Sequence, residues 1–105
     1  MSESLKPADF HILLCLADAP LHGYGIMKEV ERESSGAVRL EIGSLYRLLD
    51  RLLNQGLIEE ADSDERRKYY RITRLGRRNL KAEAERLAGL LELVRSRRLL
   101  PGADA

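Results

Sequence analysis

The sequence has 105 residues, of which 33% are charged, and its formal net charge is +1 at pH 7. This length fits one domain with a modest hydrophobic core. No apolar run approaches the roughly 18 residues of a membrane-spanning helix, and the first residues lack the pattern of a secretion signal. We therefore expect a soluble, cytoplasmic protein. The single cysteine, Cys15, excludes a disulfide within the chain.

The charges are distributed unevenly along the chain. Residues 1–60 contain six Lys or Arg against ten Asp or Glu, whereas residues 61–80 contain seven against three. A local basic cluster on an almost neutral protein is typical of an electrostatic contact surface confined to one face.

The first predicted helix begins at Pro7 and ends before Pro20. Proline is favoured at the first helical position, Asp9 suits the first turn, and the residue before a proline avoids helical geometry. Residues 10–17 are apolar nearly all round. We expect this helix to be buried in the core, against a partner, or both.

A second helix is predicted to begin at His22-Gly23-Tyr24-Gly25 and to end at Ser34-Ser35-Gly36. A short extended connector, residues 38–40, leads to a third helix. The second and third helices, joined by this connector, indicate a helix-turn-helix core. His22 and Tyr24 have two interpretations. They contact a DNA phosphate at the helix start, or they are a helix cap and a packing tyrosine.

The third helix has an apolar stripe on one face and polar side chains on the other. Its leucines recur at helical spacing and are Leu45, Leu48, Leu49, Leu52 and Leu53. Gly56 supplies the stop. Predicted DNA contacts on the polar side are Ser44, Tyr46, Arg47 and Arg51, with Arg able to bond guanine bidentately. For Arg51 an ordinary solvated surface is the alternative, and Tyr46 could be partly core.

A β-hairpin is predicted after the third helix, with strands at residues 57–60 and 69–73. Asp62-Ser63-Asp64 marks its turn, and Arg66-Arg67-Lys68 follows. The alternation of strand side chains places Tyr70 and Ile72 on one side. The basic run is either a solvated surface or a set of phosphate contacts, which fix register without selecting sequence.

A long last helix is predicted from an N-cap at Thr73 to a stop at Pro101-Gly102. Apolar residues along it are spaced 4, 3, 4, 3, as in a coiled-coil seam. Two heptads are too few for a free-standing coiled coil, so the seam should pack with the first helix. The predicted dimer interface is Phe10, Leu13, Leu14, Leu80, Ala84, Leu87, Leu91 and Val94.

The expected fold is mostly α with a small two-stranded β-wing, a winged helix-turn-helix plus a long C-terminal dimerisation helix. Residues 1–75 would bind DNA, residues 76–100 would dimerise, and residues 101–105 would form a disordered tail. We expect no catalytic site, because no nucleophile and base are paired and no phosphate-binding Gly loop occurs. His11, His22 and Cys15 are too few for a metal site, and no cofactor is expected.

Three motifs, HGYGIMKEV, GSLYRLLDRLLNQGLIEE and RRKYYRITRLGRRNL, together resemble the PadR family of winged-helix transcriptional regulators. The resemblance covers roughly residues 13–80 and implies regulation by a small apolar or aromatic effector, or by a partner, at a dimer interface. Arg47 departs from the family pattern, which often has Pro there, so base preference is not carried over.

The expected function is that of a homodimeric repressor on a pseudo-palindromic operator in double-stranded DNA. The alternative is a winged helix that serves as a protein-interaction module.

Overall fold

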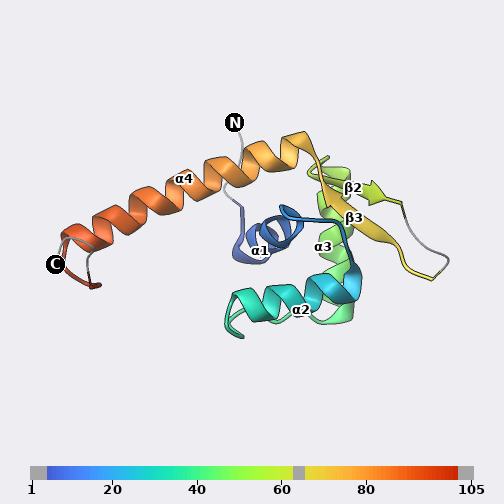
Figure 1. The fold of residues 1–105 in the computed structure, drawn as a ribbon, viewed down its shortest axis with the longest axis horizontal. Helices are drawn as coiled ribbons and strands as arrows, with labels where there is room; N and C mark the ends of the chain where they lie inside the picture. Colours follow the sequence, from blue (N-terminus) through green and yellow to red (C-terminus); the bar gives the residue numbers. More distant parts are fainter. Residues whose placement is uncertain (1–4, 63–65, 102–105) are drawn as a thin grey trace.

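The computed structural model describes residues 5–62 and 66–101. In these ranges the elements are α1 (Pro7–Leu16), β1 (Leu21–His22), α2 (Gly23–Glu33), α3 (Ile42–Asn54), β2 (Ile58–Ala61), β3 (Tyr69–Ile72) and α4 (Arg74–Ser96). Helices α1 to α3 form the body, the β2–β3 hairpin projects from one end, and α4 extends away towards the other (Figure 1). The predicted class, mostly α with a β-wing and a long last helix, is confirmed.

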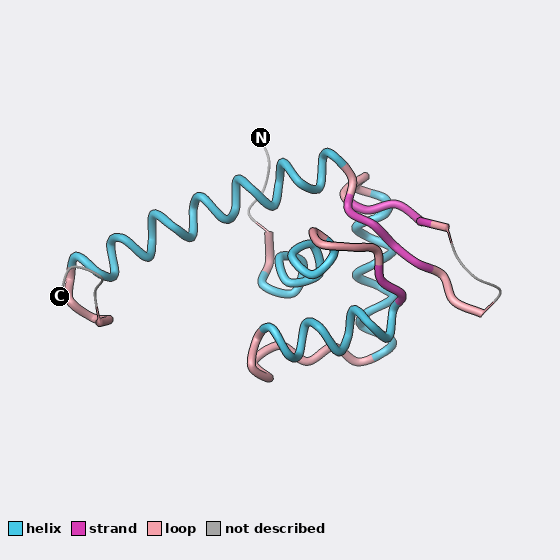
Figure 2. The backbone as a smooth tube through the Cα atoms, viewed as in Figure 1, coloured by secondary structure: helices cyan, strands magenta, loops and turns pink. Residues whose placement is uncertain are grey.

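The sheet has three strands where two were predicted. Its order is β1-β3-β2 and both pairings are antiparallel. The additional strand, β1, pairs Leu21 with Tyr70 and His22 with Tyr69. Two residues carry no detectable alternation, so this strand exists only through its partner β3. Because β1 immediately precedes α2, this pairing attaches the start of α2 to the β2–β3 hairpin (Figure 2). We call this hairpin, together with residues 66–68, the wing.

The core lies where α1, α2 and α3 meet under the sheet. Its fully buried side chains are Ile12, Leu13, Leu16, Ile26, Val30, Leu45, Leu49, Leu52 and Ile58. The predicted leucine stripe of α3 is therefore confirmed, with Leu48 and Leu53 packed at its margins. The predicted alternation of β3 is also confirmed, because Tyr70 and Ile72 are buried and Arg71 is exposed.

The end of α3 and the start of α4 are tied together. Gly56 has φ 75° and its N–H donates to the carbonyl of Leu53, while the N–H of Leu57 donates to the carbonyl of Leu52, both at 3.0 Å. This is a Schellman ending with glycine in the left-handed position. The Thr73 hydroxyl accepts from the Gly76 N–H at 3.0 Å and donates to the Gly56 carbonyl at 2.6 Å. Thr73 is therefore the N-cap predicted for it.

The predicted stop of α4 at Pro101-Gly102 is wrong, because the helix ends at Ser96. Arg98 takes the left-handed conformation with φ 59°, and the N–H of Leu99 donates to the carbonyl of Val94 at 3.4 Å. The same capping geometry thus forms on arginine, a residue that gives no stop signal in sequence. Residues 102–105 of the predicted tail, and residues 63–65 of the predicted wing turn, lie outside the described ranges.

Candidate nucleic-acid interface

The first two turns of α3 present polar side chains opposite its buried leucines. Arg47 is exposed and, within residues 5–62 and 66–101, forms no ion pair; Ser44 is half-buried, and Tyr46 is 46% exposed. Because Leu45 and Leu49 anchor the inner face in the core, these side chains face outward. An exposed guanidinium near a helix start is well placed to donate to base edges or phosphates.

The start of α2 lies directly beside the start of α3. A Cβ built on Gly23 would lie 2.8 Å from the Tyr46 hydroxyl oxygen. The phenol end of Tyr46 therefore rests on the backbone at the first residue of α2, while part of its ring stays exposed. One residue on, Tyr24 is 61% exposed, and Lys28 Nζ lies 5.2 Å from the centre of its ring. These contacts place an aromatic and cationic surface next to the polar face of α3.

His22 is both a helix cap and an exposed donor or acceptor. Its Nδ1 accepts from the Gly25 N–H at 3.1 Å, which makes it the N-cap of α2. Its other nitrogen, Nε2, lies 3.1 Å from Nη1 of Arg67 in the wing. The cap interpretation of His22 is confirmed by this geometry, and Nε2 lies on the side that faces the wing.

The basic residues of the wing are exposed. Lys68 Nζ lies 3.2 Å from a carboxylate oxygen of Glu60 on the adjacent strand, and this hydrogen bond raises the pKa of Lys68. Arg66 and Arg67 are exposed at the N-terminal approach to β3. Arg67 and β1 join the wing to the start of α2, and Tyr46 joins the start of α2 to α3. The wing, the start of α2 and α3 therefore meet at one end of the molecule (Figure 1).

Arg51 is tied to the core of the protomer by an ion pair, with 38% of its side chain exposed. Its Nη2 donates to both carboxylate oxygens of Asp9 at 2.6 Å, and Asp9 is only 6% exposed. The pair connects α3 to α1 across 42 positions of sequence. Arg51 was predicted to contact DNA or solvent. Its partner could not be predicted, because Asp9 suits a helix first turn on its own. The structure gives Arg51 a role in fixing α3 on the core.

The comparisons with known proteins agree with this arrangement. The model of the transcriptional regulator PadR-like family matches residues 12–82. The chain belongs to the PadR-like family of transcriptional regulators. A 37.1 kDa protein in transposon Tn4556 of Streptomyces fradiae is 39% identical over 83 residues, which are 79% of this PadR-like chain and 24% of that protein. The chain thus spans about a quarter of that relative's length.

Solved structures resemble the PadR-like chain over most of its length. A transcriptional regulator from Clostridium thermocellum superposes with a TM-score of 0.73 at 28% identity, covering 85% of this chain and 87% of the other. Bacillus subtilis PadR, solved in complex with operator DNA, superposes with a TM-score of 0.66 at 22% identity, covering 73% and 46%. The second likeness concerns the fold.

The residues predicted to form the dimer interface fall into two groups in the structure of this PadR-like chain, those buried in the protomer and those at its surface. Leu13 is fully buried in the protomer and Leu80 is 9% exposed, so both belong to the core. Leu87 and Leu91 are each 38% exposed, and Leu14 is 39% exposed. Phe10 and Val94 are half-buried and Ala84 is exposed. Helix α4 contacts α1 near its start, while its second half extends away from the body (Figure 1), which leaves apolar surface on a single helix.

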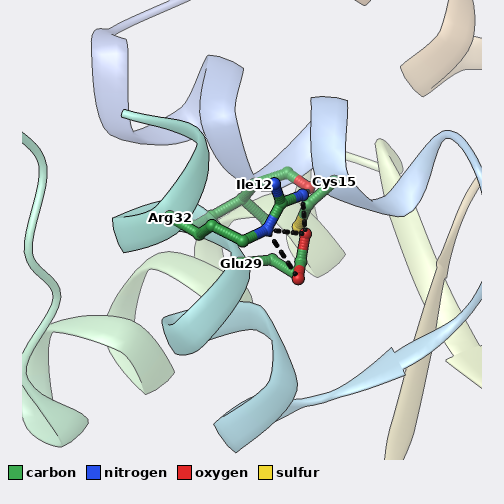
Figure 3. A network of polar contacts seen from close by, with 4 residues as sticks. All are labelled: Ile12, Cys15, Glu29 and Arg32. Carbon is green, nitrogen blue, oxygen red and sulfur yellow. Dashed lines mark hydrogen bonds and ion pairs between the residues drawn. The ribbon is translucent and has the colours of Figure 1, made fainter. Parts of the chain in front are cut away.

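Cys15 is a buried core residue whose thiol donates to the carbonyl of Ile12 at 3.1 Å. Burial, followed by the negative charges of Glu33 and Glu29, raises the pKa of Cys15 to about 12. Figure 3 shows Cys15 pointing from α1 towards α2, where Arg32 holds Glu29 in an ion pair. Over the described ranges, no three His, Cys, Asp or Glu side chains gather closely enough to hold a metal ion.

None of the helices described for this PadR-like chain combines the length and the apolar character that crossing a membrane requires.

Proposed function

We propose that the chain is a sequence-specific DNA-binding repressor that acts as a homodimer on a pseudo-palindromic operator in double-stranded DNA. The observation that carries the proposal is the meeting of three elements at one end of the protomer. Tyr46 of α3 rests on Gly23 at the start of α2, and Arg67 of the wing lies against His22. A recognition helix, a second helix start and a wing can then contact one duplex together.

Each part of this surface has a distinct proposed role. Ser44, Tyr46 and Arg47 would lie in the major groove, where Arg47 is the candidate for reading bases. Arg66, Arg67 and Lys68, with His22 and Tyr24, would hold flanking phosphates and fix the register. Lys68 would exchange Glu60 for a phosphate. Arg51 is left out of the proposed DNA contacts because it pairs with Asp9.

The proposed dimer forms through the exposed apolar face of α4 and the adjoining surface of α1. Leu87, Leu91 and Val94 would form the seam with Leu14 and Phe10, in keeping with the coiled-coil spacing of α4. The leucine stripe lies on a helix that extends from the body, and its side chains are partly exposed. Exposed apolar patches of this kind mark interaction sites, and a second copy of the chain would cover this one. Two α3 helices related by the dimer axis would then enter successive major grooves.

We also propose that a small apolar or aromatic effector, or a protein partner, releases the repressor at this interface. Such a ligand acts only through its differential affinity for the two dimer arrangements, one that spaces the recognition helices for DNA and one that does not. The chain has no Trp and one Phe, so leucine side chains would form most of the lining, beside the ring of Phe10.

The test is the salt dependence of DNA affinity for matched arginine variants. Arg47→Met should make the slope of log K against log salt shallower by about one unit, because one cation at the DNA surface is lost. If Arg47 donates to a guanine, discrimination at that base should fall by about 1–3 kcal/mol. Arg66→Ala and Arg67→Ala should each make the slope shallower by about one unit without changing sequence preference.

Arg32→Met is the control for these variants. Arg32 is an exposed arginine of the same helix-turn-helix that pairs with Glu29 beside α1, and its replacement should leave the slope unchanged. If the unmodified protein shows no affinity at low salt, or equal affinity for all sequences, the DNA-binding repressor is refuted and an interaction module is favoured.

A further inference from the structure

The imidazole of His22 is fixed as a donor on its outward side. Its Nδ1 accepts a hydrogen bond from the backbone N–H of Gly25 at 3.1 Å. A backbone N–H can only donate, so Nδ1 must present its lone pair and carry no proton. In a neutral imidazole the single proton then belongs to Nε2. The helix cap therefore selects the tautomer in which Nε2–H faces outward.

The ring plane of His22 is fixed as well. His22 pairs with Tyr69 across β1 and β3, and the two rings meet edge to face, with centres 5.4 Å apart and planes at 81°. Strand pairing, ring contact and cap together leave the imidazole few alternative orientations. Its Nε2–H is held in place before any ligand arrives, which reduces the ordering required on binding.

The outward nitrogen of His22 faces another donor. Arg67 Nη1 lies 3.1 Å from His22 Nε2, and a guanidinium has five N–H donors and no acceptor. Other contacts of Arg67 do not alter this, because no partner turns a guanidinium nitrogen into an acceptor. In the tautomer that the cap selects, two N–H groups from two elements thus lie side by side, and an anionic oxygen beside both would accept from each.

We propose that His22 Nε2 and Arg67 Nη1 hold one DNA backbone phosphate jointly, in a seat shared by the start of α2 and the wing, and that the Gly25 N–H sets His22 as its donor. This rests on the proposed DNA-binding function. The seat lies one residue from Gly23, on which the phenol of Tyr46 in α3 rests. A phosphodiester flanking the groove occupied by α3 is the anion that would reach it.

The test is a double-mutant cycle on DNA affinity with His22→Asn and Arg67→Gln. Asparagine is a strong N-cap, so it preserves the start of α2, while its shorter side chain leaves no donor at the position of Nε2. Each single variant should weaken binding by about ten- to a hundredfold, the scale of one charge-assisted hydrogen bond. Because the seat needs both donors, the double variant should bind about as weakly as either single one. Losses that multiply would overturn the shared seat.

The salt slope separates this role from a purely structural one. His22→Asn leaves the number of Lys and Arg side chains unchanged, yet it should make the salt slope shallower by up to about one unit, because Arg67 would no longer hold its phosphate. In the Arg67→Gln background the same change should leave the slope unaltered. A slope unaffected by His22→Asn in the otherwise unmodified protein would contradict the proposal.

Two further measurements complete the test. Long-range proton–nitrogen spectra should place the His22 proton on Nε2, and a proton on Nδ1 would refute the donor pair. Replacing single operator phosphates by neutral methylphosphonates should reveal one position that weakens binding of the unmodified protein but not of Arg67→Gln. Absence of such a position, in a protein that binds DNA, refutes the seat alone. Absence of any DNA binding refutes the proposed function.

Discussion

Replacement of Arg51 by Met should destabilise the fold more than replacement of its partner Asp9 by Asn. The two side chains differ in burial, since 38% of the Arg51 side chain is exposed against 9% of the Asp9 side chain. Without Arg51, a carboxylate that loses two hydrogen bonds of 2.6 Å stays buried. Leaving a buried charged group unsatisfied costs more than the roughly 1–3 kcal/mol of a neutral one, and up to about 5 kcal/mol where the pair is fully buried.

The partial exposure of Arg51 places the expected loss at about 2–3 kcal/mol, below the value for a fully buried pair. For Asp9→Asn, water can hydrate the remaining guanidinium, so the loss should be about 1 kcal/mol. The double variant should lose less than the sum of the two, with a coupling of about 1–2 kcal/mol. Urea unfolding at a fixed protein concentration measures all three values, because a dimer's apparent stability depends on concentration.

Comparison of Arg51→Met with Arg47→Met decides whether Arg51 has a DNA role. Under conditions where Arg51→Met is folded, its DNA salt slope should equal that of the unmodified protein, whereas Arg47→Met should lose about one unit. The reasoning is refuted if Arg51→Met unfolds with an unchanged free energy and a lower salt slope.

Three further predictions concern packing and association. Gly76→Ala should destabilise the fold by about 1–3 kcal/mol, because its Cβ would lie 2.1 Å from the Leu57 carbonyl oxygen. Gly89→Ala, with no neighbour within 4 Å, is the control and should stabilise by up to about 1 kcal/mol in thermal unfolding. Leu87→Glu should weaken the proposed dimer at least a hundredfold by placing charges in its apolar seam, and sedimentation of an intact dimer would contradict the seam. Since burial raises the pKa of Cys15 to about 12, iodoacetamide at pH 8 should modify the native protein on the order of a thousandfold more slowly than the unfolded chain; comparable rates would contradict that burial.

Local patterns in the sequence were sufficient to predict the elements that carry the fold. The leucine stripe of α3 is periodic enough to identify its buried face, and Gly56 and Thr73 mark helix ends through their own backbone and side-chain chemistry. What could not be predicted depends on neighbours that are distant in sequence. The two residues of β1 become a strand only beside β3, and Arg98 ends a helix without any glycine.

In the candidate site, too, local patterns identify candidate residues, and contacts with distant parts of the chain decide their roles. Arg47 and Arg51 occupy one helix one turn apart and look alike in sequence, yet Asp9 satisfies only Arg51. Leu13 and Leu14 are adjacent on a helix that is apolar all round, and only the packing distinguishes the fully buried side chain from the exposed one. Sequence therefore predicted which residues could form a DNA surface and a dimer seam, and tertiary contacts are needed to choose among them.

The most direct test of the repressor proposed here is selection of bound sequences from a pool of random double-stranded DNA by the full-length protein. The selected sequences should converge on two inverted half-sites whose centres are separated by about 10–10.5 base pairs, or a multiple of it. Enrichment of no sequence, or of a single half-site without an inverted copy, would contradict a surface duplicated by dimerisation.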